Sequence, residues 1–164
     1  MHIKQVHPRQ VQLCVAIVKY RTKLKVPRKG VCTAYLSSLK SGDTLNIRLK
    51  KGLLSLPANP QTPVICIGPG TGIAPMRAVI EHRIATGAGT NVLYFGCRSA
   101  EKDQHYKSDW AAYASNGSLT YRVACSRDNP EGVAKTYVQD LISEDSETIW
   151  GLIGVEGAWV LISG

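Results

Sequence analysis

The amino-acid sequence predicts an α/β fold, with a parallel sheet and flanking helices over residues 61–164. Short apolar runs alternate there with helical segments of ten or more residues, an order typical of β-α-β units. A proline-rich stretch, residues 56–63, precedes this alternation. The charge also changes there, because residues 1–60 carry twelve Lys or Arg and one acidic residue, whereas residues 61–164 carry eight Lys or Arg and eleven acidic residues. We therefore expect two parts, residues 1–60 and residues 61–164.

In residues 1–60 the sequence predicts two strands and one short helix. Residues 11–19 and 44–49 have the apolar patterns of strands. Between them, residues 30–39 place apolar side chains near helical spacing, after a glycine. This helix is expected to end before Ser41-Gly42.

In residues 61–164 the sequence predicts four strands separated by helices. Strands are expected at residues 64–68, 91–95, 119–124 and 158–162. Helices are expected at about residues 75–85, 103–114 and 135–142, with a further helical stretch at 147–153. Pro75 suits a first helical turn because it lacks an N–H group that would be unpaired there. Parallel sheets bind ligands at the carboxyl ends of their strands, so the residues after each strand are the candidates for a site.

The composition favours a packed core over a membrane-spanning or disulfide-rich protein. Apolar residues make up 44% of the chain, yet no run of about 18 of them occurs, and the start of the chain lacks the pattern of a signal peptide. The sequence therefore predicts no membrane span. The cysteines are odd in number and form no C-x-x-C pair, so neither a zinc site nor a disulfide framework is predicted. We expect buried free thiols in a reducing cytoplasm at Cys14, Cys32, Cys66, Cys97 and Cys125.

A glycine-rich turn follows the first strand of the predicted sheet. Its sequence is Gly68-Pro69-Gly70-Thr71-Gly72-Ile73-Ala74-Pro75. Glycines let a ligand approach the backbone, and the following helix offers free N–H groups and its positive dipole end, which suit a pyrophosphate. The turn lacks the Gly-Lys-Ser/Thr of a Walker A loop, and Ile73 takes the third glycine position of G-x-G-x-x-G. The motif alone is compatible with anion binding or with a simple turn.

Basic and hydroxyl side chains follow the next two strands. Arg98 stands after the second strand, where a site for NAD would place an acidic residue on the ribose 2′-OH. Ser126 and Arg127 stand after the third strand, with Lys135 and Tyr137 further on. Such side chains can give charge-assisted hydrogen bonds to a phosphate and an aromatic face for adenine. Taken singly, each is equally compatible with an ordinary solvated or half-buried surface residue. Together they predict a preference for the 2′-phosphate of NADP.

Four motifs, in order, resemble those of the diflavin reductase family, which includes cytochrome P450 reductase. They are residues 68–75, Tyr94-Phe95-Gly96-Cys97-Arg98, Ser126-Arg127 and Lys135-Thr136-Tyr137-Val138-Gln139, while residues 30–36 are similar to the family's flavin-pyrophosphate motif. The resemblance covers nearly the whole chain. Residues 28–33 most resemble the fungal branch that serves cytosolic iron–sulfur assembly. The resemblance implies a ferredoxin-reductase-type NADP-binding domain over residues 61–164, preceded by a partial antiparallel β-barrel, the remnant of an FAD-binding domain.

The same resemblance implies roles for individual residues. The nicotinamide and pyrophosphate of NADP would be lined by Gly68, Gly70, Thr71 and Gly72. The nucleotide phosphates or ribose would contact Arg98, and Gln139 would border the adenosine. The 2′-phosphate would be held by Ser126, Arg127, Lys135 and Tyr137. The flavin pyrophosphate would be cradled by backbone N–H groups of Gly30, Val31, Cys32 and Thr33.

The family's chemistry is implied as well. Hydride passes from NADPH to FAD, and electrons then pass singly through FMN in a flavodoxin-type domain to an acceptor protein, such as an iron–sulfur assembly factor or a cytochrome. The family's Arg-x-Tyr/Phe-Ser flavin motif has no match before His7-Pro8. Ser163-Gly164 replaces a Cys-Gly pair whose thiol lies near the hydride path, which makes Ser163 the catalytic candidate. We expect a chain shortened at both ends, which keeps the NADP-binding surface but is inactive alone.

Two other functions fit the sequence. A single-flavin enzyme of the ferredoxin-reductase type would share these motifs and would differ in the sequence before Met1. Alternatively, the basic residues 19–29, which include one tyrosine, suit a nucleic-acid or anionic-membrane surface, although no helix-turn-helix, zinc or single-strand-binding motif accompanies them. In an oxidoreductase, the same charge would attract an acidic flavodoxin-type partner, with an affinity that salt weakens.

Overall fold

The computed structural model describes residues 7–23 and 25–164, which form two compact units. The smaller unit is Gln12–Leu53, and the larger unit combines residues 7–11 with Leu54–Gly164. The expected division at residue 60 stays a prediction. The two units are defined by the contacts within each of them, whereas the predicted boundary separates two kinds of domain.

The smaller unit contains an antiparallel ribbon and one helix. Strand β1 (Lys19–Arg21) pairs with β2 (Pro27–Lys29), so that Lys19 lies opposite Lys29. Helix α1 (Val31–Ser38) follows at once, as predicted. Of the predicted partial barrel, the described residues contain this small antiparallel sheet.

The predicted strands over residues 11–19 and 44–49 are wrong except at Lys19. Both segments are irregular, and the apolar side chains Leu45, Ile47 and Leu49 are exposed. A strand is stabilised by backbone hydrogen bonds to a neighbour, and within the described residues no strand pairs with residues 11–18 or 44–49. Alternating side chains alone do not make a strand without a partner.

The larger unit is built on a parallel sheet with the strand order β5-β4-β3-β6. The strands are β3 (Val64–Ile67), β4 (Asn91–Cys97), β5 (Thr120–Cys125) and β6 (Trp159–Ile162). All three pairings are parallel, which confirms the predicted α/β fold. The chain runs outward from β3 through β4 to β5 and then returns to the other side of β3. The order therefore reverses between β3 and β6.

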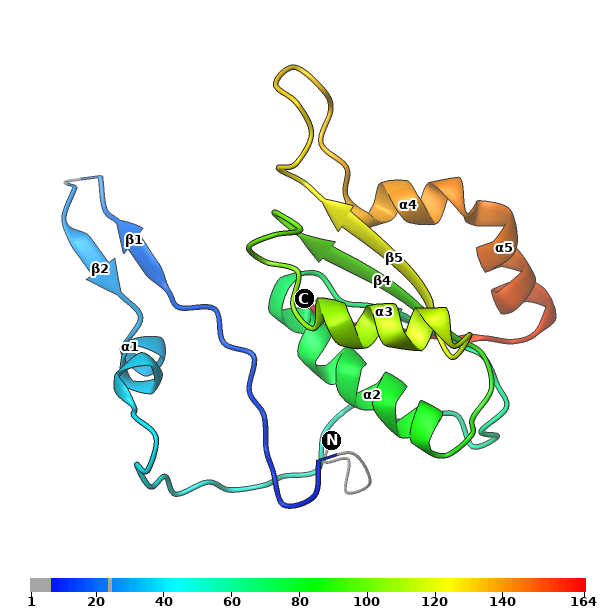
Figure 1. Cartoon of the computed structure of the whole chain (residues 1–164), viewed down its shortest axis with the longest axis horizontal. Helices are drawn as coiled ribbons and strands as arrows, with labels where there is room; N and C mark the ends of the chain where they lie inside the picture. The colour runs from blue at the N-terminus through cyan, green and yellow to red at the C-terminus, as the bar shows by residue number, and fades with distance from the viewer. Residues whose placement is uncertain (1–6, 24) are drawn as a thin grey trace. The chain divides into compact units, whose positions relative to one another are not determined.

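Helices cover both faces of this sheet. In Figure 1, β4 and β5 run between α2 (Ile73–Ala85) and α3 (Lys107–Ser115) on one side and α4 (Val138–Glu144) and α5 (Ser146–Trp150) on the other. A 3₁₀ turn, η1 (Gly70–Gly72), leads into α2, and a π-helical turn, η2 (Gly151–Val155), extends α5.

Two helices begin later than the sequence predicts. Helix α3 starts at Lys107 and not at residue 103, because Tyr106 adopts a left-handed conformation with φ 59°. Helix α4 starts at Val138 and not at residue 135, because Tyr137 is extended and its N–H group donates to Asp140 Oδ2 at 2.7 Å. In both cases the backbone before the helix is fixed by local conformation that apolar spacing does not reveal.

The core lies on both faces of the sheet because successive strand residues point to opposite sides. One face packs strand residues against α4 and η2, in a cluster of Ile65, Val92, Tyr94, Ala124, Val138, Leu141 and Leu152. The Tyr94 hydroxyl also donates to Asp145 Oδ2 at 2.8 Å, and burial together with this bond raises the pKa of Tyr94. The other face packs against α2 and α3, where Trp110 is fully buried and contacts Tyr121 of β5. The carboxyl ends of the strands are thus held in a fixed arrangement.

The prediction of five buried thiols is correct only for Cys66. All five cysteines are free, but Cys32 is exposed and the other three are partly exposed. Cys32 lies in the first turn of α1, a helix with no buried residue, so an apolar neighbourhood in the sequence does not lead to burial there.

Candidate functional site

The glycine-rich turn leaves backbone donors without partners at the end of β3. Gly68 N–H still donates to Tyr94 O of β4 at 3.0 Å, and Gly72 N–H donates to Pro69 O at 3.0 Å. Between them, the N–H groups of Gly70 and Thr71 donate to no atom of residues 7–23 or 25–164. Gly70 has φ +58°, a left-handed conformation that glycine adopts without steric cost. Two backbone donors are therefore available to an anion at the start of α2.

The end of β6 lies directly against this turn. Ser163 N–H donates to Ile67 O at 3.0 Å, which continues the pairing of β6 with β3. A Cβ atom on Gly72 would lie 1.8 Å from Ser163 O, so only a glycine permits this approach. The structure thus brings together Gly72 and Ser163, although ninety residues separate them. This is the point where the strand order reverses, and open parallel sheets bind ligands at such points.

The loops after β4 and β5 are bound to one another by backbone contacts. Ser126 N–H donates to Cys97 O at 3.0 Å, and Arg127 N–H donates to Arg98 O at 2.8 Å. Ala100 N–H donates to Asp128 Oδ2 at 2.8 Å. This backbone donor, followed by the Ser99 hydroxyl, lowers the pKa of Asp128, so its carboxylate remains charged and keeps the loops joined. The predicted residues Arg98, Ser126 and Arg127 consequently lie together.

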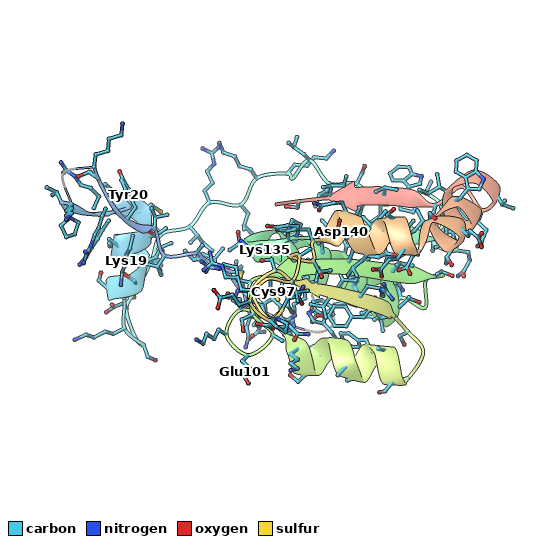
Figure 2. All side chains as sticks on the ribbon, turned by 90° about the horizontal axis from the view of Figure 1, so that it is seen from above. Lys19, Tyr20, Cys97, Glu101, Lys135 and Asp140 are labelled. Carbon is cyan, nitrogen blue, oxygen red and sulfur yellow. The ribbon has the colours of Figure 1, made fainter. Side chains whose placement is uncertain are left out.

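The remaining basic and aromatic candidates lie at the end of the loop after β5. Asn129 Nδ2 donates to Ala134 O and to Thr136 Oγ1, which closes the loop just before α4. Figure 2 shows Lys135 at the same end of the sheet as Cys97. Tyr137 is exposed at the start of α4, and Gln139 is exposed in its first turn. The structure therefore gathers these side chains at the carboxyl end of the sheet.

The cations of this region differ in their pairing. Arg98 Nε lies 3.2 Å from Asp103 Oδ2, in an ion pair whose arginine side chain is 63% exposed. Within the part of the chain that the structure describes, neither Arg127 nor Lys135 forms an ion pair. Both are exposed, so they can turn toward a phosphate without first breaking a contact.

The candidates for flavin binding belong to the smaller unit. Gly30 N–H donates to Val18 O at 2.9 Å, and Val18 N–H donates to Thr33 Oγ1 at 3.1 Å, which fixes the start of α1 on the ribbon. The N–H groups of Val31, Cys32 and Thr33 have no acceptor among the described residues, as is usual for a first helical turn. Val31 is 90% exposed. These three backbone donors are available to an anion.

The sequence did not identify three residues that shape the larger site. Asp128 and Asn129 tie the loops together, as described above. A Cβ atom on Gly96 would lie 2.8 Å from Val138 Cγ2 and 3.2 Å from Pro69 Cβ, so this glycine lets α4 and the glycine-rich turn approach β4. Asp and Asn in turns are a sequence signal, but their partners cannot be identified before the fold is known.

Comparison with known proteins agrees with this geometry. The model of the family described as oxidoreductase NAD-binding domain matches residues 66–164. The chain belongs to this family. The match begins within β3 and includes β4, β5 and β6, the glycine-rich turn and the loops after β4 and β5.

Curated relatives carry a more specific name. The chain is 43% identical over 159 residues to NADPH-dependent diflavin oxidoreductase 1 of Xenopus laevis, an alignment of 96% of this chain and 26% of that protein. Proteins of the same name from Cryptococcus neoformans and Danio rerio are 44% and 42% identical, over 96% of this chain and 25% and 27% of theirs. These relatives confirm the resemblance to diflavin reductases. The chain spans about a quarter of the length of these relatives. Among the described residues, no helix has the length and apolar character needed to span a membrane.

Proposed function

We propose that the NAD-binding domain of this chain binds NADPH and presents it to FAD, as part of an NADPH-dependent diflavin oxidoreductase. The observation that carries the proposal is the meeting of the glycine-rich turn, the end of β6 and the bound loops after β4 and β5 at one end of the sheet. The names of the relatives support the choice of NADPH and flavin.

The chain's own residues divide the work of binding. The N–H groups of Gly70 and Thr71 would hold the pyrophosphate, with the close approach of the backbone permitted by Gly68 and Gly72. The 2′-phosphate would accept bonds from Ser126, Arg127 and Lys135 and lie beside Tyr137. Arg98 would contact the phosphates or ribose, and Gln139 would border the adenosine.

Ser163 is the proposed catalytic residue because its backbone abuts the glycine-rich turn that would line the nicotinamide. The bound cofactors would supply the redox chemistry, which is hydride transfer from NADPH to FAD followed by single-electron transfer through FMN. The protein supplies placement, and the Ser163 hydroxyl would orient the nicotinamide by hydrogen bonding. The N–H groups of Gly30, Val31, Cys32 and Thr33 would hold the flavin pyrophosphate.

The partners and location are part of the same proposal. The electrons would pass to a flavodoxin-type FMN domain and then to an acceptor protein of cytosolic iron–sulfur assembly, in the cytoplasm. The ribbon of the smaller unit supports an acidic partner, because its exposed basic side chains include Lys19, Arg28 and Lys29. A shift in the electrophoretic mobility of DNA of arbitrary sequence, abolished by salt and found without any binding of a flavodoxin domain, would instead favour a nucleic-acid surface.

Titration of the purified chain with 2′,5′-ADP and 5′-AMP tests the nucleotide site. We expect tighter binding of 2′,5′-ADP, and we expect Arg127→Gln and Lys135→Gln each to weaken it roughly tenfold, since a hydrogen bond to a charged group contributes about 1.5–3 kcal/mol. The affinity for 5′-AMP should not change in either variant. Lys51→Gln, which makes the same change of charge in the smaller unit, is the control. Equal affinity of the unmodified chain for the two nucleotides would contradict the proposal.

Flavin content tests the expectation that this chain is inactive alone. Among the described residues, only the exposed start of α1 is proposed to contact FAD, so we expect the purified chain to carry little FAD and to show no NADPH oxidation with artificial acceptors. Absorbance of flavin released by denaturation measures the content. A stoichiometric, tightly held yellow flavin would show that the expectation is wrong.

A further inference from the structure

Two cysteines face one another at the carboxyl ends of β4 and β5. Cys97 and Cys125 are paired residues in the register of these parallel strands, and their Sγ atoms lie 3.4 Å apart. Both are free and partly exposed. Neither has a role in the proposed binding of NADPH, and within residues 7–23 and 25–164 no other two cysteine thiols are hydrogen-bonded to each other.

The backbone positions suit a disulfide bond. Such a bond needs Sγ atoms about 2.05 Å apart and Cα atoms about 4.4–6.8 Å apart. Neighbouring strands lie about 4.7–4.9 Å apart, so directly paired residues fall within that range. Closing the gap between the sulfur atoms therefore requires mainly rotation of the two side chains, with small shifts of the strands.

The pair lies at the base of the two loops that carry the candidate cations. Cys97 O accepts the Ser126 N–H bond, and Cys97 and Cys125 immediately precede Arg98 and Ser126. We propose that Cys97 and Cys125 form a redox-active dithiol, which hydroperoxides convert to a disulfide, and that the disulfide weakens binding of a 2′-phosphate by the adjoining loops. The second half of this proposal rests on the proposed function, whereas the first half does not.

The oxidation is a two-electron reaction with a hydroperoxide. The Cys125 thiolate attacks one peroxide oxygen, the O–O bond breaks, and the alcohol leaves with a proton, so that Cys125 becomes a sulfenic acid. The Cys97 sulfur then attacks the Cys125 sulfur, the S–S bond forms, the S–O bond breaks, and water leaves with the thiol proton. The two sulfurs lose two electrons, and the hydroperoxide is reduced to alcohol and water.

The surroundings of the pair assign the order of attack. Burial raises the pKa of Cys97 to about 12, and the hydrogen bond with Cys125 and the charges of Asp103 and Asp128 act in the same direction. Cys97 therefore stays protonated, and its S–H lies within reach of the Cys125 sulfur, 3.4 Å away. We assign Cys125 as the attacking sulfur and Cys97 as the sulfur that closes the disulfide.

Closing the disulfide affects the phosphate site through the backbone. The sulfur atoms must approach by more than 1 Å from their present 3.4 Å, since a disulfide is about 2.05 Å long. Any part of this change not absorbed by side-chain rotation moves Arg98 and Ser126, and binding groups must be held to within about 0.5 Å of their productive positions. Weaker binding in the oxidised state follows.

Peptide mapping tests the dithiol. The reduced chain is treated with hydrogen peroxide at about pH 8, where thiolates are more abundant than at neutral pH, then alkylated and digested with trypsin. Cleavage sites, including Arg98 and Arg122, lie between the two cysteines, so the disulfide joins two peptides. We expect this joined pair as the main product, and its absence in Cys97→Ser and Cys125→Ser. Formation of disulfides with Cys32 alone, or of sulfinic acids without a joined pair, would overturn the proposal.

Binding of 2′,5′-ADP to reduced and oxidised chain tests the second half. We expect the oxidised chain to bind roughly threefold to tenfold more weakly, as for the loss of about one hydrogen bond, and dithiothreitol to restore the affinity. Peroxide should leave the affinity of Cys97→Ser unchanged. Equal affinity of reduced and oxidised chain would overturn the second half alone. Failure of the reduced chain to bind 2′,5′-ADP would instead contradict the proposed function and the second half with it, while the peptide map still decides the dithiol.

Discussion

Replacement of Gly72 by Ala is expected to lower the free energy of unfolding by about 3 kcal/mol, near the upper end of the usual cost of overpacking a core. The added Cβ atom would lie 1.8 Å from Ser163 O and 2.4 Å from Ser163 C. Backbone atoms cannot move aside as the end of a side chain can. Relief of the contact therefore requires β6 or the glycine-rich turn to move.

The conformation of Gly72 isolates this clash as the cause. Its φ of −61° and ψ of −14° are helical values that alanine adopts readily, so no backbone strain adds to the effect. Urea denaturation measures the loss of stability, and titration with 2′,5′-ADP measures the accompanying loss of binding.

Gly151→Ala is the matched control. Gly151 is also helical, with φ −56° and ψ −47°, and an added Cβ atom would have no neighbour within 4 Å. This variant should be unchanged or more stable by up to about 1 kcal/mol, because alanine favours a helix over glycine. Equal stability of the Gly72→Ala and Gly151→Ala variants would show that β6 does not lie against the turn.

The larger unit could be predicted from its sequence because its signals are local. A strand buried on both faces, such as β3, appears as a continuous apolar run, and Pro75 marks the first turn of α2. The smaller unit could not be predicted as well. Its apolar residues Leu45, Ile47 and Leu49 alternate as in a strand, yet they are exposed and have no partner strand in the described residues.

The position of the candidate site could be predicted from the sequence, because its residues directly follow the predicted strands. The parallel order places Arg98, Ser126 and Arg127 at one edge of the sheet, and this required only the positions of β4 and β5. The contacts between the loops could not be foreseen, because Asp128 and Ala100 are 28 residues apart in sequence. The 3.4 Å approach of Cys97 to Cys125 likewise depends on the register of two strands, which apolar patterns do not fix to one residue.

Arg83→Met is expected to be the most destabilising change of a charged residue in the larger unit. Arg83 is 2% exposed, and its Nε donates to Asn91 Oδ1 at 2.6 Å. One terminal nitrogen donates to Thr62 O at 2.8 Å and lies 3.3 Å from the carbonyl oxygens of Gly89 and Thr90. Burial lowers the pKa of Arg83, but an arginine stays protonated at neutral pH. The buried charge is therefore held by oxygen dipoles, without a carboxylate partner among the described residues.

Methionine has a similar length but donates no hydrogen bond, so Arg83→Met would leave Asn91 Oδ1 and Thr62 O without their donor. The other two oxygens keep a donor, since Gly89 O accepts from Asn91 Nδ2 and Thr90 O accepts from Val64 N–H. We expect a loss of about 3–5 kcal/mol in the free energy of unfolding, measured by urea denaturation. Arg98→Met removes an arginine that is 63% exposed and should change stability by about 0.5 kcal/mol or less. The oxygens that Arg83 binds lie just before β3 and β4 or on Asn91, the first residue of β4, and so at the amino ends of the strands. The candidate nucleotide site lies at their carboxyl ends. The folded fraction of Arg83→Met should therefore bind 2′,5′-ADP as the unmodified chain does, and a parallel loss of affinity would show that the two ends of the sheet are coupled.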